Sequence, residues 1–173
     1  MTSSARAGSR ADPLDTSLLF EVFALNQAVG RFLAEAMRDG PLTPAEYAVS
    51  SAIFELEAAT PTALAARLGM RLTTFMDQLR AMERRGHASR LPNPADRRSR
   101  RVVLTADGLA AHRAANRQFE AAHAAYVAAL GSGEAHSRQV LRAMREAADR
   151  TGADRTGAPA GATSRSRSSA AVG

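Results

Sequence analysis

Apolar side chains recur every three or four positions between about residues 15 and 38. This spacing predicts an amphipathic helix, which the Gly40-Pro41 pair ends because proline cannot continue it. The apolar face is wider than one small core needs, so we expect this helix to pack against a second copy of the chain. Its main stripe consists of Leu18, Val22, Leu25, Val29 and Phe32, widened by Leu14, Leu19, Phe23, Leu33 and Met37.

Two Thr-Pro pairs predict the starts of the next two helices. Thr43-Pro44 is followed by Glu46, a capping box with proline at the first helical position. This helix has an apolar face that includes Tyr47, Ile53, Phe54 and Leu56. Thr60-Pro61 opens a short helix that Gly69 ends. A further helix follows from about Leu72 to Arg85 and ends at Gly86, so the spacing predicts a helix-turn-helix.

The residues after Gly86 alternate as in a strand. We expect strands at His87–Leu91 and at Arg101–Leu104, joined by a turn at Pro92–Ala95. Helices are then expected from Thr105 to Gly131 and from Glu134 to Arg150, the last with three inward side chains, Val140, Leu141 and Met144. A hairpin directly after the second helix of a helix-turn-helix is a wing.

The predicted fold class is therefore mainly α with a small β-hairpin wing, a winged helix-turn-helix flanked by terminal dimerisation helices. Residues 13–40 and 106–150 are expected to form the dimerisation helices, and residues 41–105 the nucleic-acid-binding region. Residues 1–12 and 151–173 have almost no large apolar side chains, so we expect disordered tails.

Charge is concentrated in one segment. The net charge is +6, and residues 67–101 contain ten arginines against three carboxylates, which makes +7. All basic residues are arginine, as in a GC-rich coding bias, so the clustering is informative and the residue type is not. Such clustering indicates a polyanionic partner.

Other classes of protein lack support in the sequence. Cysteine is absent, which excludes disulfides and thiolate chemistry. We find no export signal and no apolar run of membrane length, and expect a cytoplasmic protein. No nucleophile, phosphate-loop or paired-carboxylate motif is present, so we expect neither catalysis nor a cofactor. His112 and His123 lie about 16 Å apart along a helix and cannot by themselves chelate one metal ion.

The predicted helix at 72–85 has one anchoring face and one polar face. Phe75, Leu79 and Met82 share the face that turns to the core. Two rows point outward, Arg71, Thr74, Gln78 and Arg85 in one and Thr73, Asp77, Arg80 and Arg84 in the other. These donors, with one carboxylate, suit the base edges in the major groove of duplex DNA. An ordinary solvated face is the alternative.

The predicted wing carries closely spaced arginines whose mutual repulsion would be unfavourable without a polyanion. We expect Asp96 to accept a bidentate bond from Arg98 and hold its guanidinium extended toward a minor groove. A purely structural Asp96–Arg98 pair is the alternative. The predicted wing contacts are Arg90, Asp96, Arg97, Arg98, Arg100 and Arg101.

Four motifs, in order and at similar spacing, resemble the MarR family of bacterial regulators: Leu64–Met70, Leu79–Gly86, Pro92–Arg98 and Val103–Gly108. The resemblance covers roughly residues 15–150. It implies a homodimer that binds a pseudo-palindromic double-stranded DNA operator, with the recognition helix in the major groove and the wing in the minor groove. It also implies regulation by small ligands in a cleft between the dimerisation and DNA-binding regions. We expect the protein to be a repressor that such a ligand releases from DNA.

This sequence departs from the family at the recognition helix. Arg71-Leu72 stands where a Ser-Pro or similar cap is common, and Asp77 stands where a basic or polar reader is common, so the operator sequence cannot be transferred. A cleft lined by Phe23, Tyr47 and Phe54 could accept an aromatic or lipophilic effector, although these residues also suffice as plain core. A nonspecific architectural nucleic-acid-binding winged helix is the competing function.

Overall fold

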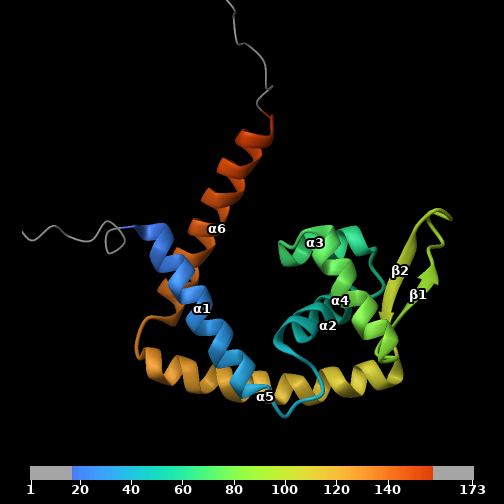
Figure 1. The fold of residues 1–173 in the computed structure, drawn as a ribbon, viewed down its shortest axis with the longest axis horizontal. Coiled ribbons are helices and arrows are strands. Elements are labelled where there is room, and N and C mark those ends of the chain that lie inside the picture. Colours follow the sequence, from blue (N-terminus) through green and yellow to red (C-terminus); the bar gives the residue numbers. More distant parts are fainter. Residues whose placement is uncertain (1–16, 158–173) are drawn as a thin grey trace, which may run out of the picture. The chain divides into compact units, whose positions relative to one another are not determined.

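The computed structural model describes residues 17–157, which form six helices and one hairpin (Figure 1). The chain divides into two compact units, Met1–Tyr126 and Val127–Gly173, with the boundary inside α5. The elements are α1 Leu18–Ala36, α2 Pro44–Leu56, α3 Pro61–Leu68, α4 Leu72–Arg84, β1 Ala88–Pro92, β2 Arg100–Leu104, α5 Ala106–Leu130 and α6 Glu134–Gly157. The winged helix-turn-helix predicted from the sequence is confirmed.

The helix starts form as the Thr-Pro pairs predict. The hydroxyl of Thr43 accepts from the backbone N–H of Glu46 at 3.3 Å, and the Glu46 carboxylate accepts from the N–H of Thr43 at 2.9 Å. Thr60 caps α3 in the same way, by accepting from Ala63. These capping bonds, which are reciprocal only at Thr43, satisfy N–H groups that have no partner inside the helix.

Both helices of the helix-turn-helix end in a left-handed glycine. Gly69 has φ 63° after α3 and Gly86 has φ 73° after α4. Beyond each glycine the next N–H bonds back to the helix, Met70 to the carbonyl of Ala65 and His87 to that of Met82. This pairing is a Schellman motif, and glycine adopts its left-handed conformation without a Cβ penalty.

The core lies between α2, α3, α4 and the hairpin. Phe75, Leu79 and Met82 of α4 are each 0% exposed, which confirms the anchoring face predicted from their spacing. They pack with Val49, Ile53, Leu64 and Val102, among others. A second cluster, which includes Met37, Leu42, Tyr47 and Ala115, joins the end of α1 and the start of α2 to α5.

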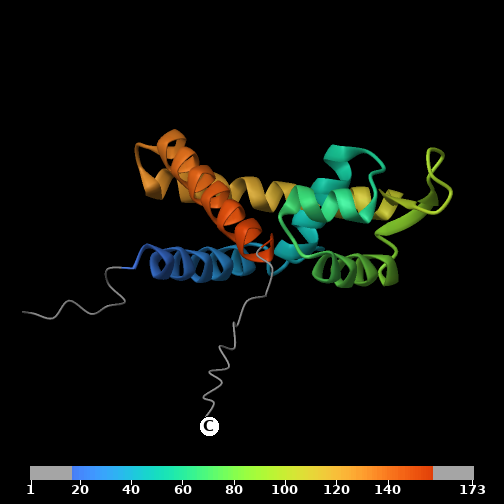
Figure 2. The ribbon, with the colours of Figure 1, turned by 90° about the horizontal axis from the view of Figure 1, so that it is seen from above.

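The hairpin pairs antiparallel, with Arg90 opposite Val102 and Pro92 opposite Arg100. It projects beyond the helices α2, α3 and α4 of its unit (Figures 1 and 2). The N–H of Val102 also donates to the carbonyl of Ala59 at 2.9 Å, which fixes β2 to the loop before α3. The base of the hairpin is held by Gly108 of α5, where a Cβ would lie 1.8 Å from the carbonyl oxygen of His87.

Two expectations about the last helix are wrong. α6 runs to Gly157, seven residues beyond the expected end at 150, because no proline interrupts this stretch and a helix tolerates the lone Gly152. Val140 and Leu141, expected to point inward, are exposed. The tail expected at 1–12 lies outside the described residues. Of the tail expected at 151–173, residues 151–157 belong to α6 and residues 158–173 lie outside the described range. No helix in the described range is long and apolar enough to cross a membrane.

Candidate nucleic-acid interface

The first turn of α4 presents an open polar surface. Arg71, Thr73 and Thr74 are exposed, and Gln78 is half-buried one turn further on. Arg71 occupies the N-cap position and makes no side-chain capping bond, as its side chain lacks a suitable acceptor. The first turn therefore offers free backbone N–H groups as well as three exposed side chains, and such helix starts favour anions.

Asp77 and Arg80, both predicted to contact bases, pair with each other. Their Oδ1 and Nη1 atoms lie 2.9 Å apart, one helical turn from each other and on an exposed surface. An exposed pair of this kind contributes little to stability, so it can open to other partners at low cost. Arg84, further along α4, is exposed, and no ion pair with it is found among the described residues.

Arg85 does not belong to the outward row in which its spacing placed it. Its Nη1 lies 2.8 Å from both carboxylate oxygens of Glu46, and its Nη2 donates to the carbonyl of Pro41. Burial raises the pKa of Glu46, but the hydrogen bonds from Thr43 and Arg85 outweigh it and hold this pKa below its usual value. Arg85 is the C-cap of α4 and keeps a helical backbone conformation, but its long side chain bends back to Glu46, so the helical row does not fix the position of its guanidinium.

Arg90, predicted as a wing contact, faces α4. Its Nε and Nη2 donate to the two carboxylate oxygens of Glu83 at 2.6 and 3.0 Å. Both side chains are about 30% exposed, at 32% and 28%. This bidentate pair ties β1 to the recognition helix, so Arg90 supports the wing and is not available to a polyanion in this arrangement.

The wing tip is organised by Asn93, which the sequence analysis did not single out. Its amide donates to the Ser99 hydroxyl at 2.7 Å, and its oxygen accepts from the Ala95 N–H at 3.1 Å and from Arg101 Nε at 3.0 Å. Asn93 is 9% exposed. The available signal was its position in the turn, since asparagine favours turns by bonding to the backbone two residues on.

Asp96 acts on the backbone of Arg98 and not on its guanidinium. Its Oδ1 accepts from the Arg98 N–H at 2.9 Å, which closes an Asx-type turn, and the expected bidentate bond does not form. The short Asp96 side chain reaches the N–H two residues on, whereas the long Arg98 side chain extends into solvent. Arg97, Arg98 and Arg100 are all exposed.

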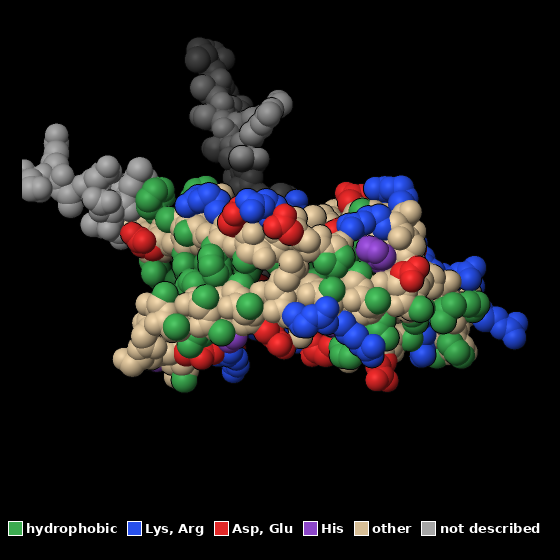
Figure 3. All heavy atoms as spheres, turned by 90° about the horizontal axis from the view of Figure 1, so that it is seen from below, with side chains coloured by type: hydrophobic (Ala, Val, Ile, Leu, Met, Phe, Trp, Pro, Cys, Tyr) green, Lys and Arg blue, Asp and Glu red, His purple; other side chains and the backbone are tan. Residues whose placement is uncertain are grey.

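The ten arginines of residues 67–101 thus fall into two sets. Five have side-chain partners: Arg67, Arg80, Arg85, Arg90 and Arg101. The other five are exposed and have no side-chain partner in the described part of the chain: Arg71, Arg84, Arg97, Arg98 and Arg100. We call these the free arginines. Blue side chains gather at the end of the molecule where the hairpin lies (Figure 3).

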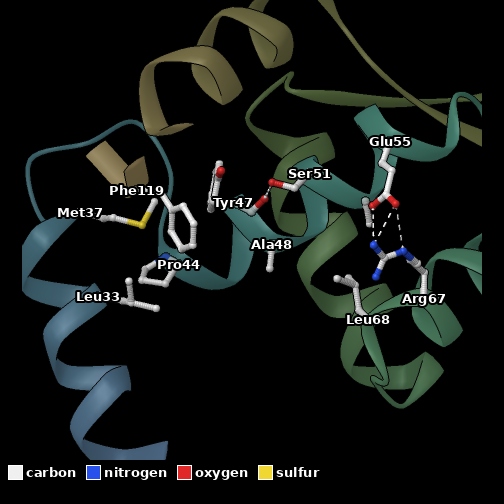
Figure 4. Close-up of a pocket in the computed structure, with 11 residues that line it drawn as sticks. Leu33, Met37, Pro44, Tyr47, Ala48, Ser51, Glu55, Arg67, Leu68 and Phe119 are labelled. Atoms are coloured by element: carbon white, nitrogen blue, oxygen red, sulfur yellow. Dashed lines mark hydrogen bonds and ion pairs between the residues drawn. The ribbon is translucent and has the colours of Figure 1, made fainter. Parts of the chain in front are cut away.

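A pocket of about 370 Å³ lies between the end of α1, α2, α3 and α5 (Figure 4). Tyr47 and Phe119 line one part, and the ion pair of Glu55 and Arg67, 2.8 Å apart, lines another (Figure 4). The pair joins α2 to α3, so the pocket borders the helix-turn-helix directly.

A second hollow, of about 480 Å³, lies between α2 and α5. Tyr47 and Phe54 line it, as predicted, with His112, Arg113 and Arg117. Phe23 lines neither of these two pockets; it is 59% exposed on α1. Two of the three residues predicted for a ligand cleft are therefore together.

His112 is buried against this second hollow. Its ring stacks on Tyr47 and Phe54, and its Nδ1 lies 2.9 Å from the hydroxyl of Ser50. The hydroxyl of Ser50 also donates to the carbonyl of Tyr47 at 2.8 Å. Burial, helped by the nearby Arg113, lowers the pKa of His112. The residues described contain no cluster of potential metal ligands.

The sequence and the fold of this chain are similar to those of known proteins. Residues 42–99 match the MarR family. The chain is similar to PcaV of Streptomyces coelicolor, a transcriptional regulator solved with its natural ligand, at 25% identity and a TM-score of 0.72 over 80% of this chain and 98% of that one. No curated protein matches the chain significantly.

The similar structures that contain DNA include two regulators at 25–26% identity. One is the transcriptional regulator MOSR of M. tuberculosis, at 26% identity and a TM-score of 0.70 over 78% of this chain and 98% of that one. The other is the transcriptional repressor CouR on a 23-mer duplex, at 25% identity and a TM-score of 0.66 over 79% and 94%. Residues 42–99 thus match the MarR family, and the chain is similar in fold to solved MarR-family transcription regulators.

Proposed function

We propose that this protein is a sequence-specific repressor that binds a pseudo-palindromic operator in double-stranded DNA as a homodimer. The open polar first turn of α4, on the same compact unit as a wing with unpaired arginines, carries this proposal. α4 enters the major groove, where Arg71, Thr73, Thr74 and Gln78 reach base edges or phosphates. The wing enters the adjacent minor groove.

The free arginines supply the electrostatic attraction. Arg97, Arg98 and Arg100 lie at the wing and Arg71 and Arg84 on α4, so they can reach the backbone on both sides of a groove. Asp77 and Arg80 read bases after their mutual pair opens. Arg90 and Arg101 act indirectly, because Glu83 and Asn93 hold their guanidinium groups.

The second copy covers the apolar face of α1. No residue of α1 is buried in the single chain, although the helix carries many large apolar side chains. Leu18, Leu19 and Phe23 are more than half exposed. An exposed apolar surface of this extent marks an interface. Residues 13–40 and 106–150 form the dimerisation region and residues 41–105 the DNA-binding region.

A small aromatic or lipophilic effector regulates binding from the hollows beside Tyr47 and Phe54. The proposal is supported by similar structures that contain ligands: PcaV with its natural ligand, and CouR from Rhodococcus jostii RHA1 with p-coumaroyl-CoA. An occupant of the 370 Å³ pocket would contact Glu55 and Arg67, and so could shift α3 relative to α2.

Fluorescence anisotropy tests the function directly. The full chain is titrated with a randomised duplex DNA library, from which an operator is selected, and with duplex RNA of matched length. RNA has a major groove too deep and narrow for α4, so we expect preference for DNA. The logarithm of affinity should fall with the logarithm of salt with a slope of about −6 to −9, as expected for seven to ten phosphates.

Three outcomes contradict the proposal. Preference for RNA removes the regulator assignment, and a slope near zero removes the role of the free arginines. Equal affinity for the selected operator and for scrambled duplexes favours the alternative function, a nonspecific architectural protein.

A further inference from the structure

Arg85 joins three separate segments of the DNA-binding unit. It follows the last residue of α4, and its guanidinium reaches Glu46 in the first turn of α2 and the carbonyl of Pro41 in the loop after α1. Both carboxylate oxygens of Glu46 accept from Arg85 Nη1 at 2.8 Å. One of them also accepts from the Thr43 N–H at 2.9 Å. The recognition helix is thereby tied to the start of α2 and to the loop that leads from α1.

This contact cannot be exchanged freely for a phosphate. The Glu46 side chain is only 7% exposed, whereas that of Arg85 is 44% exposed. If Arg85 turned toward DNA, the Glu46 carboxylate would lose its cation inside the protein, and an unpaired buried charge is strongly destabilising. Arg84, the residue before it, is exposed and has no acidic partner among the described residues. The two adjacent arginines therefore have different roles.

We propose that Arg85 and Glu46 form a clamp that positions the recognition helix, and that neither residue contacts DNA. The inference rests on the proposed DNA-binding function. Phe75, Leu79 and Met82 hold the buried face of α4 through apolar contacts, which are not directional. The clamp adds a directional bond at the C-terminal end.

A small rotation of α4 at its C-terminal end produces a larger displacement of its first turn. α4 is about 20 Å long at 1.5 Å per residue. A rotation of about 5° about its C-terminal end moves its first turn, which bears Arg71, by roughly 1.7 Å. Such a shift is comparable with the whole tolerance of a hydrogen bond to a base. The clamp therefore controls how both recognition helices of a dimer match the spacing of two half-sites.

The test compares adjacent arginines. Arg85→Met is measured beside Arg84→Met as matched control, and beside the double variant Glu46→Gln, Arg85→Met, which avoids an unpaired buried carboxylate. Each full-length protein is titrated with the selected operator and with versions whose half-sites are moved by one or two base pairs, between 50 and about 250 mM salt. Circular dichroism melts verify that each variant is folded.

We expect Arg84→Met to lower the magnitude of the salt slope by about 1 and to keep the spacing preference. Arg85→Met and the double variant should lose about tenfold in affinity for the operator, keep the wild-type slope, and discriminate less between spacings. A merely structural loss of stability would not change the ranking of spacings.

Other results overturn the inference. A reduced slope with unchanged spacing preference in Arg85→Met makes Arg85 a phosphate contact. Wild-type behaviour of the folded double variant means that the clamp positions nothing. If the wild-type protein binds no duplex at all, the proposed function itself fails, an outcome distinct from either of these.

Discussion

Asn93 connects both strands of the wing through one side chain. Its amide group bonds to Ser99, to the Ala95 N–H and to Arg101. Asn93→Ala should lose about 1 kcal/mol of unfolding free energy, because it removes three hydrogen bonds that the buried Asn93 side chain makes within the wing tip. It should also weaken operator binding several-fold through a looser tip. Urea unfolding and anisotropy measure the two effects.

A conservative variant controls for this change. Asn93→Asp keeps the acceptor for Arg101 and loses the donor to Ser99, so its affinity should lie between wild type and alanine. Equal affinity of all three proteins would mean that the tip does not need Asn93.

Arg98 lies at the wing with its backbone held by Asp96 and its side chain exposed. Arg98→Ala should weaken operator binding by more than about 1 kcal/mol, since it removes a charge-assisted contact, and should leave the fold intact. Arg38→Ala serves as a control, because Arg38 pairs with Glu35 and lies outside the proposed DNA-binding region of residues 41–105. Light scattering checks that this variant has the wild-type oligomeric state. Unchanged affinity removes Arg98 from the contacts.

His112 makes stability depend on pH. Its pKa in the folded protein lies below 6.5, mainly through burial, so the unfolded chain binds more protons at mildly acidic pH. The contribution of the neutral ring is complete above pH 6.5 and is lost as the pH falls toward the folded pKa. Wild type should therefore lose more unfolding free energy between pH 7 and 5 than His112→Asn does. Parallel curves in urea titrations would refute this.

The recognition helix lacks an N-cap, and this affects stability and binding in opposite directions. Arg71→Ser supplies a side-chain acceptor for the first turn and should raise the unfolding free energy by about 1 kcal/mol. The same change removes a free arginine, so operator affinity and the magnitude of the salt slope should both fall. Urea unfolding and anisotropy on one preparation check both signs. An increase in both the unfolding free energy and the operator affinity would show that Arg71 makes no contact with DNA.

Local signals in the sequence are sufficient to predict most elements. Thr43-Pro44, Thr60-Pro61, Gly69 and Gly86 each act within one helical turn, and all four lie at the predicted helix ends. The buried face of α4 could be predicted in the same way, because Phe75, Leu79 and Met82 lie within two helical turns of one another.

The partners of long side chains could not be predicted in this way. Arg85 finds Glu46 39 positions away, and Arg90 finds Glu83 across the turn into β1. Both bonds depend on how the helices and strands pack, and no repeating pattern in the sequence indicates them. For the same reason the charge cluster indicated a polyanion, while its division into free and held arginines required the structure.

At the scale of the whole molecule, basic charge and apolar surface lie on different elements. The free arginines are on α4 and at the wing, and the exposed apolar side chains are prominent on α1. Green side chains are exposed in the left-hand part of Figure 3, where α1 lies. This separation allows a dimer to form without covering the DNA-binding surface.

The dimer can be broken at one position of α1. Phe23 is 59% exposed, and Phe23→Glu would place a carboxylate within the proposed apolar interface. Light scattering should give the wild type about twice the chain mass of 18.3 kDa at micromolar concentration, and Phe23→Glu a shift toward the monomer. Ala28→Glu is the matched control. It adds the same charge about 140° around the helix, at 100° per residue, and should stay dimeric. Operator affinity should fall with the dimer fraction, because two recognition helices then no longer bind together. A wild-type monomer, or dissociation by both variants alike, would exclude α1 as the specific interface.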